Sequence, residues 1–193
     1  MKIAILNGSP RKQNTSAMVD AFCEGAKEAG HKVEVLHVGK MKIGGCMGCE
    51  YCHTKGEGKC IQKDDMEKVM PAYLDADMIV YASPVYYFDV TAQLSAAMQR
   101  VYAIGKPPKA KKAALLISSG SPNTGEGAVV TYRNMLSYMG IEDAGVITAA
   151  IIAIEISRAE DIFDIPLLRT MRFTASTTNG TPDIITDIHA GSR

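Results

Sequence analysis

The sequence lacks an excess of charge of either sign. Lysine and arginine together number 21, as do aspartate and glutamate, so the formal net charge is zero. Proteins that bind nucleic acid or anionic membranes through their overall field carry a clear basic excess. The balance therefore argues against nucleic-acid and membrane partners. It leaves small ligands, which need only local charge.

Long hydrophobic runs are also missing. The N-terminal MKIAILNGSP has four apolar residues in a row before Asn7, whereas a signal peptide needs about 7–15. The longest apolar stretch, Ala144 to Ile154, contains Gly145 and Thr148 and is shorter than the about 20 residues of a membrane-spanning helix. We therefore expect a cytoplasmic protein whose thiols stay reduced.

Common nucleotide-binding and hydrolytic motifs are absent as well. The chain has no G-x4-G-K-[ST] phosphate loop and no G-x-G-x-x-G dinucleotide fingerprint. It shows no Ser/His/Asp or paired-carboxylate constellation, so hydrolysis is not the expected activity.

What the sequence does contain is a regular alternation of strand-like and helix-like segments over 193 residues, 47% of them hydrophobic. Such a pattern predicts a single α/β domain, a three-layer, doubly wound parallel sheet with helices on both faces. The expected strands are Lys2–Leu6, Lys32–Val38, Asp77–Ser83, Lys112–Ser118 and 144–154. The expected helices are Thr15–Ala29, 64–74 (capped by Asp64 or Asp65), Thr91–Ile104, Glu126–Met139 and one near Pro166, with a tail from about Thr174 left unplaced.

Parallel sheets of this kind bind ligands beyond the carboxyl ends of their strands, which directs attention first to the loop Asn7–Ser16. Hydroxyl and amide donors crowd this loop, and Arg11 and a helix N-terminus add positive charge, all of which suits a phosphate. The plainer interpretation is an ordinary capped helix. The number of donors together with Arg11 favours the phosphate of a mononucleotide.

Two further loops follow later strands. Ser83–Asp89 carries Tyr86, Tyr87 and Phe88 in succession, which could face a flat heteroaromatic ligand or pack into a core or subunit interface; the residues alone favour neither. Ser118–Glu126 is rich in glycine and serine, so its backbone can approach a ring system closely.

Four of the five cysteines lie between Gly44 and Cys60. Cys46, Cys49, Cys52 and Cys60 have the spacing C-x2-C-x2-C-x7-C in a glycine-rich loop, 44–62. A reducing compartment disfavours disulfides, which leaves a 4Fe–4S cluster, ahead of a metal-free redox loop and zinc. The fifth, Cys23, lies on the inner face of the first expected helix and is expected to be a buried, inert thiol.

Taken in order, "GSPRKQNTS", the cysteine motif and "SPVYYFDV" resemble the flavodoxin-fold NAD(P)H-dependent FMN reductase family, and within it the iron–sulfur flavoprotein branch. The resemblance covers roughly Lys2 to Gly140 and fades after about Ala150. It implies a strand order 2-1-3-4-5 and FMN at the three loops. By motif position, the phosphate would be held by Ser9, Arg11, Asn14, Thr15 and Ser16, and the flavin lined by Pro84, Val85, Tyr86, Tyr87 and Phe88, with Ser119 and Gly120 opposite.

The function expected from this resemblance is an FMN-dependent oxidoreductase that passes electrons to a small acceptor such as a quinone or free flavin. NAD(P)H is the expected electron donor without a cluster, and a ferredoxin-like donor is favoured with one. The alternatives are a cluster-free reductase and a non-enzymatic flavodoxin-like carrier; carriers are often strongly acidic, and this chain is neutral. We also expect a homodimer or tetramer. The aromatic and cysteine loops are expected to project from the same end of the sheet, with the cluster beside the flavin site and relaying electrons to or from FMN.

Overall fold

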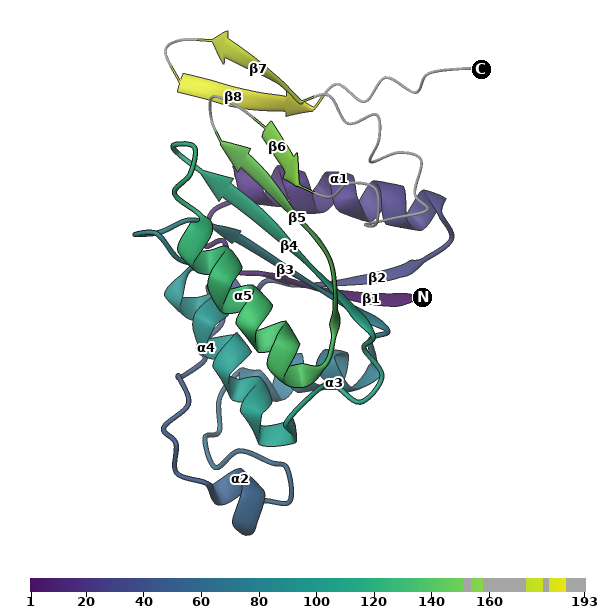
Figure 1. The fold of residues 1–193 in the computed structure, drawn as a ribbon, viewed down its shortest axis with the longest axis vertical. Helices are drawn as coiled ribbons and strands as arrows, with labels where there is room; N and C mark the ends of the chain where they lie inside the picture. The colour runs from purple at the N-terminus through teal and green to yellow at the C-terminus, as the bar shows by residue number, and fades with distance from the viewer. Residues whose placement is uncertain (151–153, 158–172, 179–180, 187–193) are drawn as a thin grey trace.

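The computed structural model describes residues 1–150, 154–157, 173–178 and 181–186, and side chains are described for 1–150. Strands and helices alternate along the chain up to the fifth strand (Figure 1). The strands are β1 (Lys2–Asn7), β2 (Lys32–Leu36), β3 (Met78–Pro84), β4 (Lys112–Ser119), β5 (Glu142–Ala150), β6 (Ile154–Ser157), β7 (Phe173–Thr178) and β8 (Thr181–Thr186). The helices are α1 (Asn14–Glu28), α2 (Tyr51–Thr54), α3 (Met66–Asp75), α4 (Ala92–Arg100) and α5 (Glu126–Met139), with 3-10 turns η1 (Val38–Lys40) and η2 (Val101–Ile104).

The main sheet has the order β2-β1-β3-β4-β5-β6, and its first five strands are parallel. On β1, for example, Ile5 is paired with Val35 on one side and Val80 on the other. The α/β class predicted from the sequence and the strand order 2-1-3-4-5 implied by the family resemblance are both confirmed. The order reverses at β1, so the loops after β1 and β3 diverge there and leave a crevice beyond the carboxyl edge.

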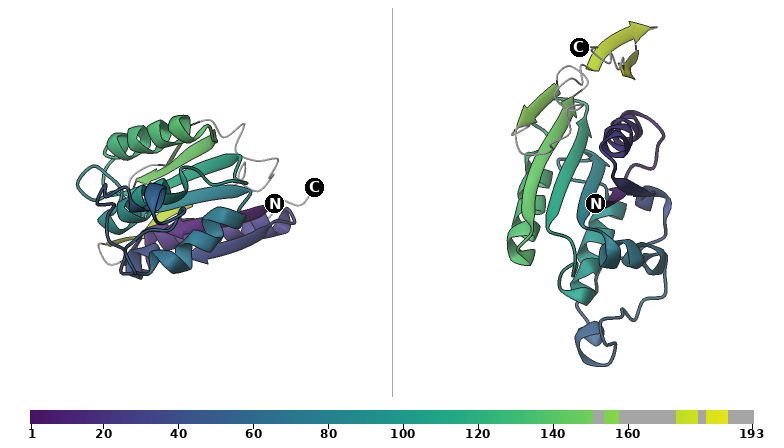
Figure 2. Two further views of the ribbon diagram at one scale, coloured as in Figure 1. Left: turned by 90° about the horizontal axis from the view of Figure 1, so that it is seen from below. Right: turned by 90° about the vertical axis from the view of Figure 1, so that its right-hand side faces the viewer.

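Helices cover both faces of the sheet (Figure 2). Alternate residues of each central strand point to opposite faces: Ile5 packs with α1, whereas Leu6 packs with the helices of the other face, α3, α4 and α5. Strands β3 and β4 are buried along nearly their whole length, as expected for parallel strands covered on both sides.

Several predicted boundaries agree with the structure, and others need correction. Helix α5 has the expected bounds and ends at Gly140, whose φ of 64° is the left-handed conformation that favours glycine. The helix expected to run to Ile104 is regular only to Arg100 and then tightens into η2. Of the two predicted caps of α3, Asp64 accepts the Met66 N–H at 3.0 Å, whereas Asp65 occupies the N-cap position without a side-chain bond to the helix.

The fifth strand differs most from its prediction. It was expected to continue to Ile154, but β5 ends at Ala150, and Ile154 begins β6, which runs antiparallel to β5. The helix expected near Pro166 lies outside the described residues. In the tail, β7 and β8 form a separate antiparallel pair. None of the described helices has the length and apolar character needed to cross a bilayer.

Candidate functional site

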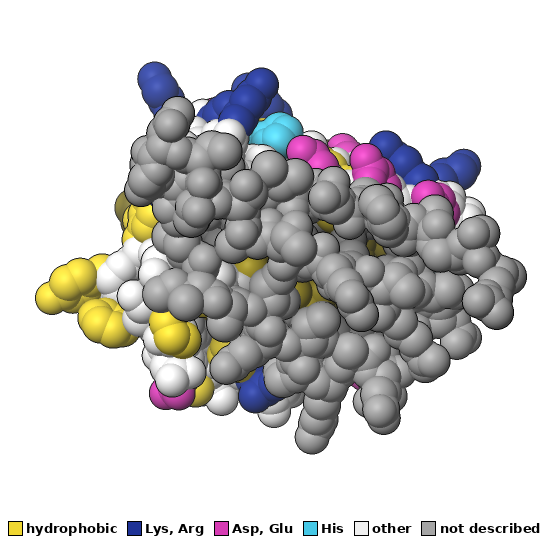
Figure 3. Space-filling view, turned by 90° about the horizontal axis from the view of Figure 1, so that it is seen from above, with side chains coloured by type: hydrophobic (Ala, Val, Ile, Leu, Met, Phe, Trp, Pro, Cys, Tyr) yellow, Lys and Arg dark blue, Asp and Glu magenta, His cyan; other side chains and the backbone are white. Residues whose placement is uncertain are grey.

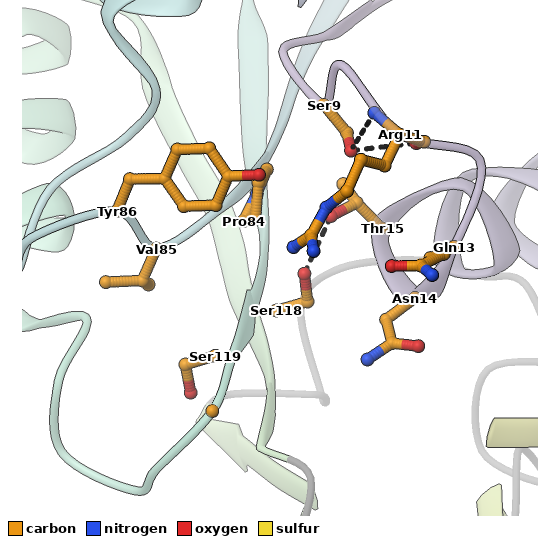
Figure 4. Close-up of a pocket in the computed structure, with 11 residues that line it drawn as sticks. Ser9, Arg11, Gln13, Asn14, Thr15, Pro84, Val85, Tyr86, Ser118 and Ser119 are labelled. Carbon is orange, nitrogen blue, oxygen red and sulfur yellow. Dashed lines mark hydrogen bonds between the residues drawn. The ribbon is translucent and has the colours of Figure 1, made fainter. Parts of the chain in front are cut away.

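A cleft of about 490 Å³, open solvent included, lies at the carboxyl edge between the loops that follow β1, β3 and β4 (Figure 4). This is the crevice that the reversal of strand order creates. Its lining combines hydroxyl, amide and guanidinium groups with one aromatic ring. The residues that line it are Ser9, Arg11, Gln13, Asn14, Thr15, Pro84, Val85, Tyr86, Ser118, Ser119 and Gly120.

The loop after β1 is shaped by its own side chains. Buried Asn7 accepts the Ser9 N–H through Oδ1 at 2.9 Å, and the Ser9 hydroxyl donates to the Arg11 carbonyl at 2.9 Å and accepts the Arg11 N–H at 3.2 Å. These bonds turn the chain sharply into α1. The N-cap residue Gln13 makes no side-chain bond to the first turn, so the helix presents its N–H groups and partial positive charge to the cleft.

The walls of the cleft come from elements far apart in sequence. The Arg11 guanidinium carbon lies 5.8 Å from the centroid of the Tyr86 ring, and Figure 4 shows the side chain pointing between Tyr86 and Thr15. Below it, the hydroxyls of Thr15 and Ser118 are hydrogen-bonded at 2.7 Å, which joins α1 to β4. The Arg11 guanidinium therefore lies above the hydroxyl groups of Thr15 and Ser118.

Close backbone packing holds the first loop in place. Thr91, the N-cap of α4, donates its hydroxyl to the Gly8 carbonyl at 2.8 Å. On the other side is Gly39 of η1, where an added Cβ would lie 2.5 Å from the Gly8 oxygen and from the Ser9 carbonyl carbon and oxygen. The first loop is thus packed between η1 and α4, which restricts its movement away from a ligand.

The aromatic loop has an unusual backbone. Tyr86 and Asp89 pair as an antiparallel bridge, and the two residues between them, Tyr87 and Phe88, have φ of 50° and 71°. Large side chains rarely adopt this left-handed region, and the strain is commonly found at functional sites. Tyr87 is 97% exposed and Phe88 63% exposed.

Nine of the twelve residues predicted to hold FMN line the cleft together: Ser9, Arg11, Asn14, Thr15, Pro84, Val85, Tyr86, Ser119 and Gly120. The other three, Ser16, Tyr87 and Phe88, are not part of the lining. The Ser16 hydroxyl donates to the Arg11 carbonyl at 3.3 Å. Gln13 and Ser118 line the cleft but were not among the predicted residues. Both belong to loops expected to bind a ligand, and their positions within those loops were the available signal.

The cysteine loop follows η1 and encloses the single turn α2. Cys46 and Cys49 are exposed, Cys60 is half-buried and Cys52 is buried. Burial raises the pKa of the Cys52 thiol. The Gly48 N–H donates to the Cys46 sulfur at 3.5 Å. Within the described part of the chain, no three His, Cys, Asp or Glu side chains converge to hold a single metal ion.

The position of this loop corrects one expectation. The loop leaves η1 beside the cleft but runs along α4 to its far end, where the Cys46 N–H donates to Gln99 at 3.4 Å and Glu50 accepts the Tyr102 hydroxyl at 3.0 Å. Since Thr91 precedes α4 beside the first cleft loop and a helix rises about 1.5 Å per residue, Gln99 and the Cys46 backbone that it binds lie roughly 12 Å farther down. The cysteine and aromatic loops therefore lie at different ends of α4, and the arrowheads of β3–β5 point away from α2 (Figure 1).

Comparison with known proteins assigns the family. The sequence model of a family described as NADPH-dependent FMN reductase matches residues 1–154. The chain belongs to this family. The match covers α1, the three cleft loops and the cysteine loop, so the site described above lies wholly within the family's shared region.

Two curated relatives place the chain in the iron–sulfur flavoprotein branch of the FMN reductase family. An iron–sulfur flavoprotein of Archaeoglobus fulgidus is 40% identical over 112 residues, 58% of this chain and 50% of that protein. One of Methanocaldococcus jannaschii is 43% identical over 110 residues, 56% of this chain and 55% of that protein. The chain thus spans about half the length of the curated relatives it matches.

A solved structure supports the fold. An NAD(P)H:quinone oxidoreductase from Methanothermobacter marburgensis superposes with a TM-score of 0.61 at 23% identity, covering 78% of this chain and 83% of that one. At this level of identity the likeness concerns the flavodoxin-like architecture alone.

Proposed function

We propose that this FMN reductase family member binds FMN non-covalently in the cleft and is an oxidoreductase that transfers electrons to a small acceptor such as a quinone or free flavin. The observation that carries the proposal is the cleft at the strand-order reversal, where an uncapped helix N-terminus and Arg11 face a floor of hydroxyl groups. When bound, FMN supplies the redox chemistry, and the protein supplies its position and surroundings.

The residues of the cleft divide into two groups in this proposal. Arg11 and the first-turn N–H groups of α1 would bind the dianionic phosphate. The two hydrogen bonds between the Ser9 hydroxyl and the Arg11 backbone hold the loop that carries these donors in place. Tyr86 and the backbone around Gly120 face the flavin ring system.

A binding experiment with two ligands tests the phosphate site. Arg11→Ala should weaken FMN binding about tenfold or more, the equivalent of one hydrogen bond to a charged group, and should leave riboflavin binding nearly unchanged because riboflavin lacks the phosphate. Lys12→Ala is the matched control, since this neighbouring exposed cation is not part of the cleft lining. Equal losses for FMN and riboflavin, or equal losses in the two variants, would contradict the assignment.

Steady-state kinetics separates the enzyme from the alternative electron carrier. Oxidation of NADH and NADPH is followed with a quinone, a ferric compound or free flavin as acceptor. Repeated turnover supports the reductase, whereas a single stoichiometric reduction without turnover supports the carrier.

We further propose that Cys46, Cys49, Cys52 and Cys60 bind a 4Fe–4S cluster in a reducing, cytoplasmic setting. The donor set fits: four free thiols share one loop, and a backbone N–H already points at sulfur. Each cysteine of a 4Fe–4S cubane ligates a different iron, so the four sulfurs do not have to converge on one ion. The four ligands of a zinc site do have to converge on one ion. A bound cluster would supply single-electron chemistry and favour a ferredoxin-like donor over NAD(P)H.

Iron and acid-labile sulfide, measured per subunit after anaerobic purification with zinc alongside, test the cluster. About four of each is expected. No iron after anaerobic reconstitution would instead support the cluster-free reductase.

We propose that the protein assembles as a homodimer or tetramer through the aromatic loop. Tyr86, Tyr87 and Phe88 are 40%, 97% and 63% exposed, and hydrophobic side chains project from one edge of the molecule in Figure 3. Exposed apolar groups of this size are typical of interaction surfaces. Light scattering at micromolar concentration should give a multiple of 20.7 kDa; a clean monomer mass would contradict the proposal.

A further inference from the structure

Arg100, the last residue of α4, is a buried cation at the base of the cysteine loop. Only 2% of its side chain is exposed. Its terminal nitrogens hold both stems of the loop: Nη1 donates to the Gly44 carbonyl at 2.9 Å, and Nη2 donates to the Gln62 carbonyl at 3.4 Å. Both also donate to the Asp64 carboxylate, at 2.7 and 3.3 Å. The guanidinium thus joins the beginning and the end of the cysteine loop.

One donor of this guanidinium is left over. Arg100 Nε is buried and has no hydrogen-bond partner among the residues the structure describes. An unsatisfied buried N–H of a charged group is costly, so such a group commonly has a partner that completes the site. Cys60 is the cysteine nearest to this donor along the chain, because Arg100 Nη2 already binds the carbonyl of Gln62, two residues after Cys60.

We propose that Arg100 is a positioning residue which donates its Nε–H to the sulfur of Cys60 in the loaded protein and raises the reduction potential of the 4Fe–4S cluster. The inference rests on the cluster proposed above. Reduction adds an electron to the cluster, so a buried cation and an N–H···S bond stabilise the reduced form more than the oxidised form. Nothing in the FMN cleft takes part, because Arg100 lies at the opposite end of α4 from Thr91.

Asp64 makes the inference testable because it opposes Arg100. The carboxylate partly neutralises the guanidinium, and its own pKa is lowered by Arg100 and two backbone N–H groups despite a contrary effect of burial. Removing the arginine charge should therefore lower the cluster potential, and removing the aspartate charge should raise it. A residue that only fastens the loop would give shifts of the same sign from both changes, since both break the same contact.

The experiment is an anaerobic redox titration of the reconstituted holoprotein, followed by absorbance and electron paramagnetic resonance, with iron counted in every sample. At the midpoint potential of the parent protein, Arg100→Gln should reduce the ratio of reduced to oxidised cluster about tenfold or more, equivalent to about 59 mV for a one-electron couple. Asp64→Asn should increase that ratio. Arg100→Lys, which keeps the charge without the Nε–H, should fall between Arg100→Gln and the parent.

The matched control is Lys63→Gln, which removes a cation immediately after the cysteine loop. The Lys63 side chain is 77% exposed, so water screens its effect to less than about twofold. Shifts of the same sign in Arg100→Gln and Asp64→Asn, no shift in Arg100→Gln, or equal loss of iron from both would overturn the role assigned to Arg100. Absence of iron from the reconstituted parent would overturn that role and the cluster proposal together.

Discussion

Replacing Gly39 by alanine is expected to destabilise the flavin-free protein by about 1–3 kcal/mol. The new Cβ would lie 2.5 Å from three backbone atoms of Gly8 and Ser9, below the 3.0 Å that real Cβ atoms respect. Backbone atoms cannot rotate out of the way as a side chain can, so the first loop or η1 has to shift. Overpacking of this kind typically costs 1–3 kcal/mol, or roughly 2–12 °C in Tm for a domain of this size. FMN binding should weaken as well, because the displaced loop carries the proposed phosphate donors.

The same substitution at Gly120 provides the control. An added Cβ there has no neighbour within 4 Å, and the backbone is outside the left-handed region. Alanine at a compatible glycine stabilises a protein by about 0.4–1 kcal/mol through the unfolded chain. Gly120→Ala should therefore raise the Tm of the flavin-free protein slightly, while its methyl group enters the cleft and weakens FMN binding.

Thermal and denaturant unfolding of the flavin-free proteins, together with FMN titrations, measure both effects. If Gly39→Ala is as stable as the parent, close packing of η1 against the first loop does not limit the space at Gly39. If both alanine variants lose the same stability, the loss reflects glycine replacement in general and the steric argument fails.

Other parts of the molecule allow further predictions. Tyr132→Phe should cost about 1–3 kcal/mol in urea unfolding, because buried Tyr132 donates to the Asp143 carboxylate at 2.9 Å; no loss would mean that this bond contributes nothing. Bonds and charges from two lysines lower the pKa of Asp75 to about 2, so its stabilising effect should be complete above about pH 4 and disappear as the pH falls toward 2; an NMR titration with a midpoint near 3.9 would contradict this. In metal-free protein, iodoacetamide should label Cys49 rapidly and Cys23 slowly, because burial shields Cys23 and raises its pKa; equal labelling by mass spectrometry would refute that placement.

Most of the fold was predictable because its signals are local. The helix Glu126–Met139 is closed by a glycine that adopts the left-handed conformation, and Lys112–Ser118 matches β4 to within one residue. The fifth strand was predicted too long for a physical reason. An apolar run such as 144–154 has the same composition whether the chain continues straight or turns back, so it does not show that Ile154 belongs to an antiparallel neighbour.

The cleft was predictable to the level of its loops, but not every contact within it was. The sequence places Ser118 at the end of a predicted strand. Only the folded chain shows that its hydroxyl is hydrogen-bonded to that of Thr15, which is 103 residues away in the sequence. The predicted location of the cysteine loop was wrong for a similar reason. The loop begins next to the cleft, and contacts with residues some 50 positions later, such as Gln99, carry it to the other end of α4.

Because Arg100 joins the two ends of the cysteine loop, the length of that loop has little effect on the stability of the sheet. Gly44 and Gln62 are already held together by one guanidinium, so residues inserted between Cys52 and Cys60 lengthen a loop that is closed elsewhere. Closure entropy grows slowly, by about 0.6 kcal/mol for each doubling of loop length. The spacing of the fourth cysteine is therefore free to drift during evolution, and metal-binding capacity can be gained, retuned or lost in this segment while the α/β scaffold keeps its fold.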